Sequence, residues 1–183
     1  MIQPVLIGRK EESDILTECL KSHSSELVAI YGRRRVGKTY LVRTTYKNAI
    51  CFEITGIYNA SLKTQLTNFR QSLEASVDKT LSLAIPENWL DAFQQLKRYI
   101  GQIKQTGKKV IFFDELPWLD TRRSGFLAAF EHFWNSWAAK RQDLIVIICG
   151  SAASWMIKKV VNSKGGLHNR ITKKIRLDRK SVV

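Results

Sequence analysis

Residues 32–39 read Gly32-Arg33-Arg34-Arg35-Val36-Gly37-Lys38-Thr39. This stretch fits the pattern G-x-x-x-x-G-K-[ST], in which two glycines let the backbone curl so that successive N–H groups point inward. Such a curl, followed by the positive end of a helix, attracts phosphate oxygens. The stretch therefore predicts a phosphate-binding loop of an ATP site, with Lys38 at the β- and γ-phosphates and the Thr39 hydroxyl on Mg²⁺.

The residues on either side of the loop support this interpretation. Residues 26–31 form an apolar run typical of a buried parallel strand, and residues 38–43 can begin a helix. A glycine-containing turn that fits the pattern by accident is the alternative, and the order strand, loop, helix argues against it. Which of the three arginines approaches a phosphate, and which face solvent, stays open because the middle of the loop tolerates almost any residue.

A second buried strand is expected from residue 108 on, and its four apolar residues 110–113 are followed by the two carboxylates Asp114 and Glu115. In open parallel sheets ligands bind at the carboxyl ends of the strands, so both acids are expected near the phosphate loop. We expect Asp114 to hold Mg²⁺, through Thr39 or a water, and Glu115 to accept a proton from the water that attacks the γ-phosphate. A pair of solvated acids at a strand end is the alternative.

The apolar run 144–149 is followed by Gly150 and Ser151. In a parallel sheet this strand should neighbour the one that ends in Asp114, because consecutive elements usually lie side by side. The Ser151 hydroxyl could position the attacking water or contact the γ-phosphate. It could equally cap the following helix, and the residues alone leave both roles open.

Several further segments have the periodicity of secondary structure, with strands and helices alternating as in a parallel α/β sheet. Further strands are expected at 49–54 and at 171–177, the latter as a sheet edge. Helices are expected over about 10–23, from Asn59 or Ser61 to 76, over 87–105 with Leu90 pointing inward, and over 124–141. The aromatic stripe of the last helix is expected to be core rather than a surface for nucleobases.

Composition describes one globular domain of 183 residues, 44% hydrophobic and 10% aromatic. No apolar run reaches the roughly 18 residues of a membrane-spanning helix, and the start lacks the layout of a signal peptide. We therefore expect no membrane contact and a cytoplasmic protein. The three cysteines and three histidines are scattered, which indicates reduced thiols and gives no support to a zinc site.

The net charge of +14 is concentrated near the end of the chain, where residues 158–180 hold nine lysines or arginines against Asp178 alone. A basic segment of this kind could bind nucleic acid. It could also be a solvated strand edge or a surface covered by a further domain. The charge leaves these alternatives open.

Four motifs follow one another within residues 5–177. They are Leu6-Ile7-Gly8-Arg9-x-x-Glu12, Tyr31 with the loop 32–39, Phe112-Phe113-Asp114-Glu115-Leu116-Pro117-Trp118-Leu119-Asp120, and Cys149-Gly150-Ser151-Ala152-Ala153-Ser154-Trp155-Met156. Together they resemble the prokaryotic AAA+-related ATPases of the signal-transduction (STAND) type, often called archaeal-type ATPases. The resemblance implies a three-layer α/β P-loop NTPase fold. Its parallel five-stranded sheet has the order 5-1-4-3-2, with Walker B on the third strand and sensor 1 on the fourth.

The resemblance also assigns roles to individual residues. It implies that Ile7, Gly8 and Arg9 lie by the adenine, with Glu12 on the following helix, and that Ser151 is the sensor 1 residue. Arg170 stands where the family has an arginine in a Gly-Leu-x-x-Arg segment, and whether it reaches phosphate in the same chain or in a neighbour stays open. The residues expected to bind the nucleotide are Ile7, Gly8, Arg9, Gly32, Arg33, Arg34, Arg35, Val36, Gly37, Lys38, Thr39 and Tyr40, and those expected to act in catalysis are Lys38, Glu115 and Ser151.

The function implied is a slow, Mg²⁺-dependent ATPase module that serves as a nucleotide-driven switch. Its partners would be a second copy of the chain or C-terminal domains of a longer protein. A nucleic-acid-associated ATPase that uses the basic segment is the alternative. A small-molecule kinase is disfavoured because Glu115 has the place of a water-activating base.

The resemblance extends to Leu177, which predicts an ATPase core over residues 1–177 without the helical lid into which relatives continue. Residues 178–183 read Asp-Arg-Lys-Ser-Val-Val, which matches the translation of a common sequencing adapter. We therefore expect these six residues to be non-native and the natural gene to continue. Resequencing the locus from source DNA would test this, and a genuine stop codon after Val183 would contradict it.

Overall fold

The computed structural model describes residues 8–77, 82–104, 106–162 and 165–178. They form a sheet whose neighbouring strands are all parallel, in the order β2-β3-β4-β1-β5. This is the expected order 5-1-4-3-2 read from the opposite edge, so the prediction is confirmed. The strands are β1 (Glu26–Gly32), β2 (Ile50–Thr55), β3 (Lys109–Asp114), β4 (Leu144–Gly150) and β5 (Lys173–Leu177).

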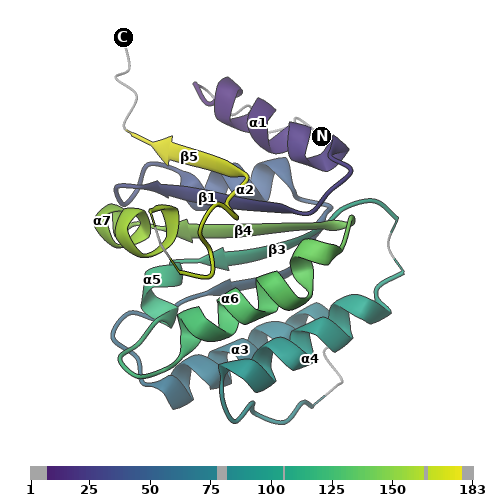
Figure 1. The fold of residues 1–183 in the computed structure, drawn as a ribbon, viewed down its shortest axis with the longest axis vertical. Helices are drawn as coiled ribbons and strands as arrows, with labels where there is room; N and C mark the ends of the chain where they lie inside the picture. Colours follow the sequence, from purple (N-terminus) through teal and green to yellow (C-terminus); the bar gives the residue numbers. More distant parts are fainter. Residues whose placement is uncertain (1–7, 78–81, 105, 163–164, 179–183) are drawn as a thin grey trace.

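Helices cover both faces of the sheet and make the fold three layers deep (Figure 1). One face packs against α1 (Lys10–Lys21) and α2 (Lys38–Thr45). The other packs against α3 (Leu62–Val77), α4 (Trp89–Gln102) and α6 (Phe126–Ser136). Two short helices, α5 (Leu116–Leu119) and α7 (Ala153–Met156), lie at the ends of β3 and β4, on the side to which the strand arrows point (Figure 1).

The central strands β3 and β4 are buried along their whole length. Alternate side chains of a strand point to opposite faces, and both faces here are covered, so every position favours an apolar residue. Val110 and Phe112 of β3 accordingly belong to the core under α1 and α2, while Ile111 and Phe113 belong to the core under α3, α4 and α6. This explains why the sequence shows unbroken apolar runs there.

The aromatic stripe of α6 is core, as predicted. Phe126, Phe130 and Phe133 have no exposed surface, and the ring of Phe133 stacks on that of Phe93 with 4.9 Å between centroids. The helix is shorter than expected, because α6 ends at Ser136 and a 3₁₀ turn follows at Ala138–Lys140. These rings are therefore not available to nucleobases.

The expectation that Leu90 points inward was wrong. The first residue of α4 is Trp89, capped by Asn88, whose side-chain oxygen accepts a hydrogen bond from the backbone N–H of Asp91 at 3.0 Å. Trp89 is 1% exposed and Leu90 is 54% exposed. Consecutive residues point about 100° apart around a helix, so burying the large indole turns Leu90 toward solvent.

At the end of the sheet where β3 and β4 begin, opposite α5 and α7, the Asp143 carboxylate forms ion pairs with two cations. Arg141 donates to it through Nε and Nη2, at 2.7 and 2.6 Å, and Lys109 Nζ donates at 2.8 Å. The hydrogen bonds from Arg141, with those from Lys109 and the positive charge of both, hold the pKa of the Asp143 carboxyl well below its usual range. A carboxyl whose folded pKa is depressed stabilises the fold above its ordinary pKa and loses that contribution as the pH falls.

We expect Asp143→Asn to lower the free energy of unfolding at pH 7 by about 1 kcal/mol, because the cations lose their charged partner and part of the group faces water. The deficit should shrink as the pH falls below about 4, because the Asp143 carboxyl of the unfolded wild-type chain then binds a proton that the folded chain does not. Urea denaturation at several pH values measures this. Asp14→Asn, on the exposed side of α1, is the control, and a deficit independent of pH would contradict the electrostatic explanation.

None of the helices within the described ranges has both the length and the apolar character needed to cross a membrane.

Candidate functional site

The loop 32–39 joins β1 to α2, as predicted. Gly32 ends the strand, and an added Cβ there would lie 2.0 Å from the backbone oxygen of Leu177, at the end of β5. Gly37 precedes α2 with a φ of 90°, a conformation that L side chains rarely adopt. Both glycines are therefore required by the backbone: one by the close approach of β5, the other by the turn into the helix.

Lys38 is 6% exposed and folds back into the curl of the loop. Its Nζ donates hydrogen bonds to the backbone oxygens of Gly32 at 3.0 Å and Arg33 at 2.8 Å. An ammonium group has three N–H donors, so one is left for a phosphate oxygen. The loop carbonyls thus fix the positive charge at the centre of the curl, where the sequence predicted it.

Thr39 and Asp114 meet although they are 75 positions apart in the chain. The Thr39 hydroxyl donates to Asp114 Oδ2 at 2.7 Å, and the backbone N–H of Glu115 donates to Asp114 Oδ1 at 3.0 Å. Asp114 is 5% exposed. A hydroxyl and a carboxylate oxygen side by side are hard donors of the kind that Mg²⁺ prefers, and Mg²⁺ needs only one or two such ligands besides phosphates. The donor set therefore fits the predicted metal.

Glu115 contacts Ser151. The carboxylate Oε2 of Glu115 accepts hydrogen bonds from the Ser151 hydroxyl at 2.8 Å and from the Ser151 backbone N–H at 3.0 Å. Glu115 itself has a φ of 47°, which turns the chain from β3 into α5. The alternative that Ser151 caps the next helix was wrong: Ala152 stands at that position, and no side chain caps α7. The hydroxyl instead orients the expected base.

A cleft of about 430 Å³ opens beside the loop. Its lining residues are Arg34, Arg35, Gly37, Lys38, Thr39, Tyr40, Glu115 and Trp118. Six of these residues come from 34–40 and belong to the set expected to bind the nucleotide, and Glu115 comes from the end of β3. Trp118 was not predicted as a site residue. It belongs to the motif that contains Asp114 and Glu115, and its place one short turn after them is the signal that could have identified it.

The remaining predicted residues lie around this cleft or away from it. Arg33 is exposed and contributes its carbonyl to Lys38, and Val36 packs against the core under α1 and α2. Arg170 is exposed and does not line the cleft. Ile7 and residues 179–183 of the expected tail lie outside the described residues.

Arg9 contacts the loop from behind. It donates to Glu12 Oε1 at 2.9 Å and, through Nη2, to the backbone oxygens of Val36 at 3.3 Å and Asp178 at 2.6 Å. Gly8 precedes it with a φ of 76°. Arg9 therefore ties the start of α1 to the phosphate loop, and its place beside the adenine stays a prediction.

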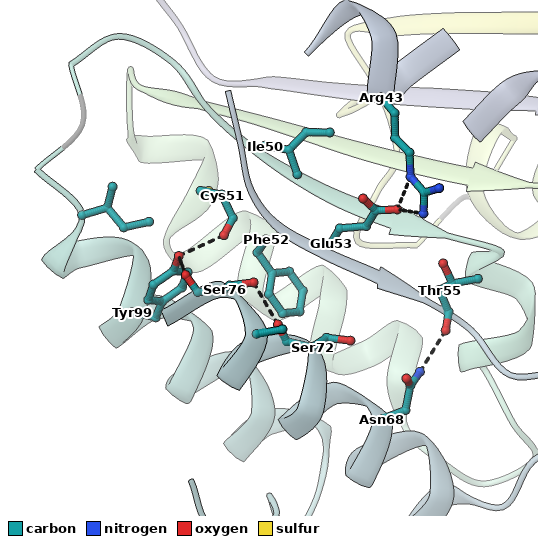
Figure 2. A pocket seen from close by; sticks show the side chains of 12 residues that line it. Arg43, Ile50, Cys51, Phe52, Glu53, Thr55, Asn68, Ser72, Ser76 and Tyr99 are labelled. Atoms are coloured by element: carbon teal, nitrogen blue, oxygen red, sulfur yellow. Dashed lines mark hydrogen bonds and ion pairs between the residues drawn. The ribbon is translucent and has the colours of Figure 1, made fainter. Parts of the chain in front are cut away.

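A second, larger hollow of about 720 Å³ runs along the outer edge of β2. Figure 2 shows how side chains from the helices close on this edge: Tyr99 Oη donates to the backbone oxygen of Cys51 at 3.0 Å and Asn68 Nδ2 to that of Thr55 at 2.8 Å. Such contacts occupy hydrogen-bonding groups that an edge strand would otherwise expose. The hollow contains none of the predicted site residues.

Comparisons with known proteins agree with this geometry. A sequence model of one family, described as an ATPase domain predominantly from Archaea, matches residues 6–179. An uncharacterized protein of Methanocaldococcus jannaschii is 30% identical over 168 residues, which cover 92% of this chain and 34% of that protein. A Walker-type ATPase of Pyrococcus abyssi has a TM-score of 0.55 at 21% identity, over 94% of this chain and 53% of that one. The ORC2 protein of Aeropyrum pernix, solved as ADPNP and ADP complexes, has a TM-score of 0.59 at 18% identity. The match covers 97% of this chain and 49% of that one.

The chain spans between a third and about half of the length of these proteins. At such identities the two solved structures show the fold alone, which is that of a P-loop NTPase core. The family match carries more, because it extends over almost the whole sequence and includes both the phosphate loop and the strand that ends in Asp114. The chain therefore belongs to the family of ATPase domains found predominantly in Archaea.

Proposed function

We propose that this ATPase domain hydrolyses ATP in a Mg²⁺-dependent reaction and works as a nucleotide-driven switch of the STAND type. The observation that carries the proposal is the hydrogen bond between Thr39 and Asp114, 2.7 Å long. It brings the hydroxyl that follows the phosphate-loop lysine against the carboxylate of the second motif. A turn that fitted the loop pattern by accident would have no reason to meet that carboxylate.

Each residue then has a defined task. Lys38 meets the charge of the β- and γ-phosphates, while Thr39 and Asp114 hold Mg²⁺, which would neutralise phosphate charge. Glu115, oriented by Ser151, takes the proton of the attacking water. Glu115 and Lys38 line the same cleft, so the expected base and the cation that meets the phosphates can act on one bound nucleotide.

The test is ATP turnover by the purified chain, with Mg²⁺ and with excess EDTA. We expect slow, saturable release of phosphate that requires Mg²⁺. Nucleotide binding is measured in parallel with a fluorescent ATP analogue. A chain that binds no ATP would contradict the proposal altogether, whereas binding without turnover would contradict only the hydrolytic part.

Ser151→Ala should lower kcat about tenfold and leave ATP affinity unchanged, since one charge-assisted hydrogen bond to Glu115 is lost while that from the backbone N–H remains. Ser154→Ala, an exposed serine of α7, is the matched control. Steady-state kinetics measure both variants. An equal loss in both, or a change in affinity without a change in kcat, would rule out the positioning of Glu115 by Ser151.

The switch part of the proposal predicts that the nucleotide changes how the chain associates. Its partners would be a second copy or further domains of a longer protein, in the cytoplasm. The Glu115→Gln variant, which is expected to bind ATP without hydrolysing it, is measured by sedimentation velocity in ATP and in ADP. A larger sedimentation coefficient in ATP would indicate self-association that depends on the triphosphate. A sedimentation coefficient that is the same in both nucleotides would speak against a switch based on self-association.

A second candidate function, a nucleic-acid-associated ATPase, is favoured by exposed cations near the end of the described chain. They are Lys158, Lys159, Arg170, Lys174 and Arg176. Binding to phosphate backbones would weaken steeply with salt. Measuring ATP turnover with and without duplex DNA, at two salt concentrations, separates the candidates: stimulation that salt abolishes favours the nucleic-acid function.

A further inference from the structure

The phosphate loop contains three successive arginines, and the structure distinguishes the middle one. The guanidinium carbon of Arg34 lies 5.2 Å from the centroid of the Trp118 ring, over its face. Within the described ranges, no carboxylate forms an ion pair with Arg34, whereas Arg9, Arg43 and Arg141 each have one. A cation in the loop thus has an aromatic partner and no anionic one.

Stacking on an aromatic face leaves the donors of an arginine free. A cation over an aromatic ring is attracted by the electron-rich face, and this attraction does not require a hydrogen bond from its N–H groups. A carboxylate partner would occupy two of those donors and cancel the charge. Trp118 therefore restricts where Arg34 can be without reducing its capacity to bind a phosphate.

Trp118 is itself firmly held. Its backbone N–H donates to Glu115 O at 2.9 Å, and its backbone oxygen accepts from Nε2 of Gln65 at 2.9 Å. Gln65 has no exposed surface and also bonds both backbone groups of Ile57. The ring of Tyr58 meets that of Trp118 edge to face, with 5.5 Å between centroids. The backbone of Trp118 is therefore held in place, and its half-buried indole lines the cleft.

The same turn carries the expected catalytic base. Glu115 begins the turn that the hydrogen bond from Trp118 closes, and both side chains line the cleft with Arg34. Glu115 acts where the attacking water meets the terminal phosphate, so Trp118 and Arg34 belong to that end of the cleft. The terminal phosphate is what distinguishes ATP from ADP.

We propose that Trp118 is a positioning residue that holds the Arg34 guanidinium ready for the terminal phosphate, so that the pair makes the site prefer ATP to ADP. This inference rests on the proposed function and deepens it by naming the residues that read the nucleotide state. On this proposal, Arg34 is the one of the three loop arginines that approaches the terminal phosphate, a choice that the sequence left open.

The experiment measures the dissociation constants of ATP and ADP with Mg²⁺ by isothermal titration calorimetry. Arg34→Ala should lower the ratio of ADP to ATP dissociation constants about tenfold, since a charge-assisted contact with the terminal phosphate is lost. Trp118→Leu should lower it about fivefold and Trp118→Phe about twofold, because phenylalanine keeps a weaker aromatic face. In the double variant, Trp118→Leu should add less than twofold to Arg34→Ala, since the ring then has nothing to position.

Trp137→Leu is the matched control. Trp137 is also partly buried and also carries an arginine on its face, with the Arg141 guanidinium carbon 4.9 Å from the ring centroid, but it does not line the cleft. The ratio of ADP to ATP dissociation constants in Trp137→Leu should equal that of the wild type. Thermal unfolding followed by circular dichroism shows whether each variant is folded.

Any of the following results would overturn the inference. If Trp118→Leu lowered the affinities for ATP and ADP equally, the ring would shape the cleft without contributing to the preference for ATP. If Trp118→Leu had its full effect in the Arg34→Ala background, Trp118 would not act through Arg34. A wild type that binds ATP and ADP alike would remove the discrimination, while one that binds neither would end the proposed function as well.

Discussion

Lys38→Ala should lower the affinity for ATP by about 100-fold or more while the fold persists, because a charge-assisted contact to the β- and γ-phosphates disappears from the centre of the loop. The structure explains the size of the effect: Lys38 is 6% exposed, and two backbone carbonyls of the loop hold its amine in place. Titration with a fluorescent ATP analogue measures the dissociation constant.

Lys47→Ala is the control for Lys38→Ala. Lys47 is an exposed lysine just after α2, so this variant removes the same charge close to the same helix but outside the loop. Thermal unfolding of both variants separates lost binding from lost folding. An unchanged dissociation constant in a folded Lys38→Ala protein would sink the assignment of the phosphate loop.

Glu115→Gln should retain Mg·ATP binding and lower hydrolysis by about 100-fold or more, as expected when a general base is removed. Glutamine is nearly isosteric and can still accept hydrogen bonds from Ser151, so the turn into α5 should persist. Single-turnover measurements with saturating ATP determine the rate of the chemical step. If the variant hydrolysed ATP at the wild-type rate, Glu115 would not be the base.

Asp114→Asn is the informative comparison for Glu115→Gln, since the two acids are neighbours in sequence. Asp114 accepts hydrogen bonds from the Thr39 hydroxyl and from the backbone of Glu115, and it is expected to hold the metal. Its replacement should weaken ATP binding in Mg²⁺ far more than ATP binding in EDTA. Asp114→Asn should therefore mainly lower the affinity for Mg·ATP, whereas Glu115→Gln should mainly lower the rate of hydrolysis, and this difference distinguishes the metal ligand from the base.

The hollow along β2 shows that size does not identify a site. It is larger than the cleft at the loop, yet it lies along a sheet edge whose backbone oxygens already accept hydrogen bonds from Tyr99 and Asn68. The smaller cleft unites the loop 32–39, the Thr39 hydroxyl and the Glu115 carboxylate at the end of β3. Chemistry that converges from distant parts of the chain is the better guide.

Local patterns in the sequence were sufficient to predict much of this protein. The glycines of the loop, Lys38 and the apolar run before Asp114 each depend on neighbours along the chain, and the strand and helix they specify form as predicted. The strand order came from the resemblance of four motifs to a known family, and the parallel sheet confirms it. Local periodicity was less reliable at helix ends, as the exposure of Leu90 shows.

Contacts between distant residues required the tertiary structure. Whether Ser151 capped a helix or met Glu115 depended on β3 and β4 pairing with Phe113 opposite Ile148, which brings the two strand ends together. Which arginine lies over an aromatic ring depended on the turn that carries Trp118, 84 positions after Arg34 and bonded to Gln65. The sequence by itself determined which residues are expected to bind phosphate and metal, because the spacing within each motif is a local property of the chain. Only the folded chain decided which side chains orient them, because that depends on strand register and side-chain packing across the sheet.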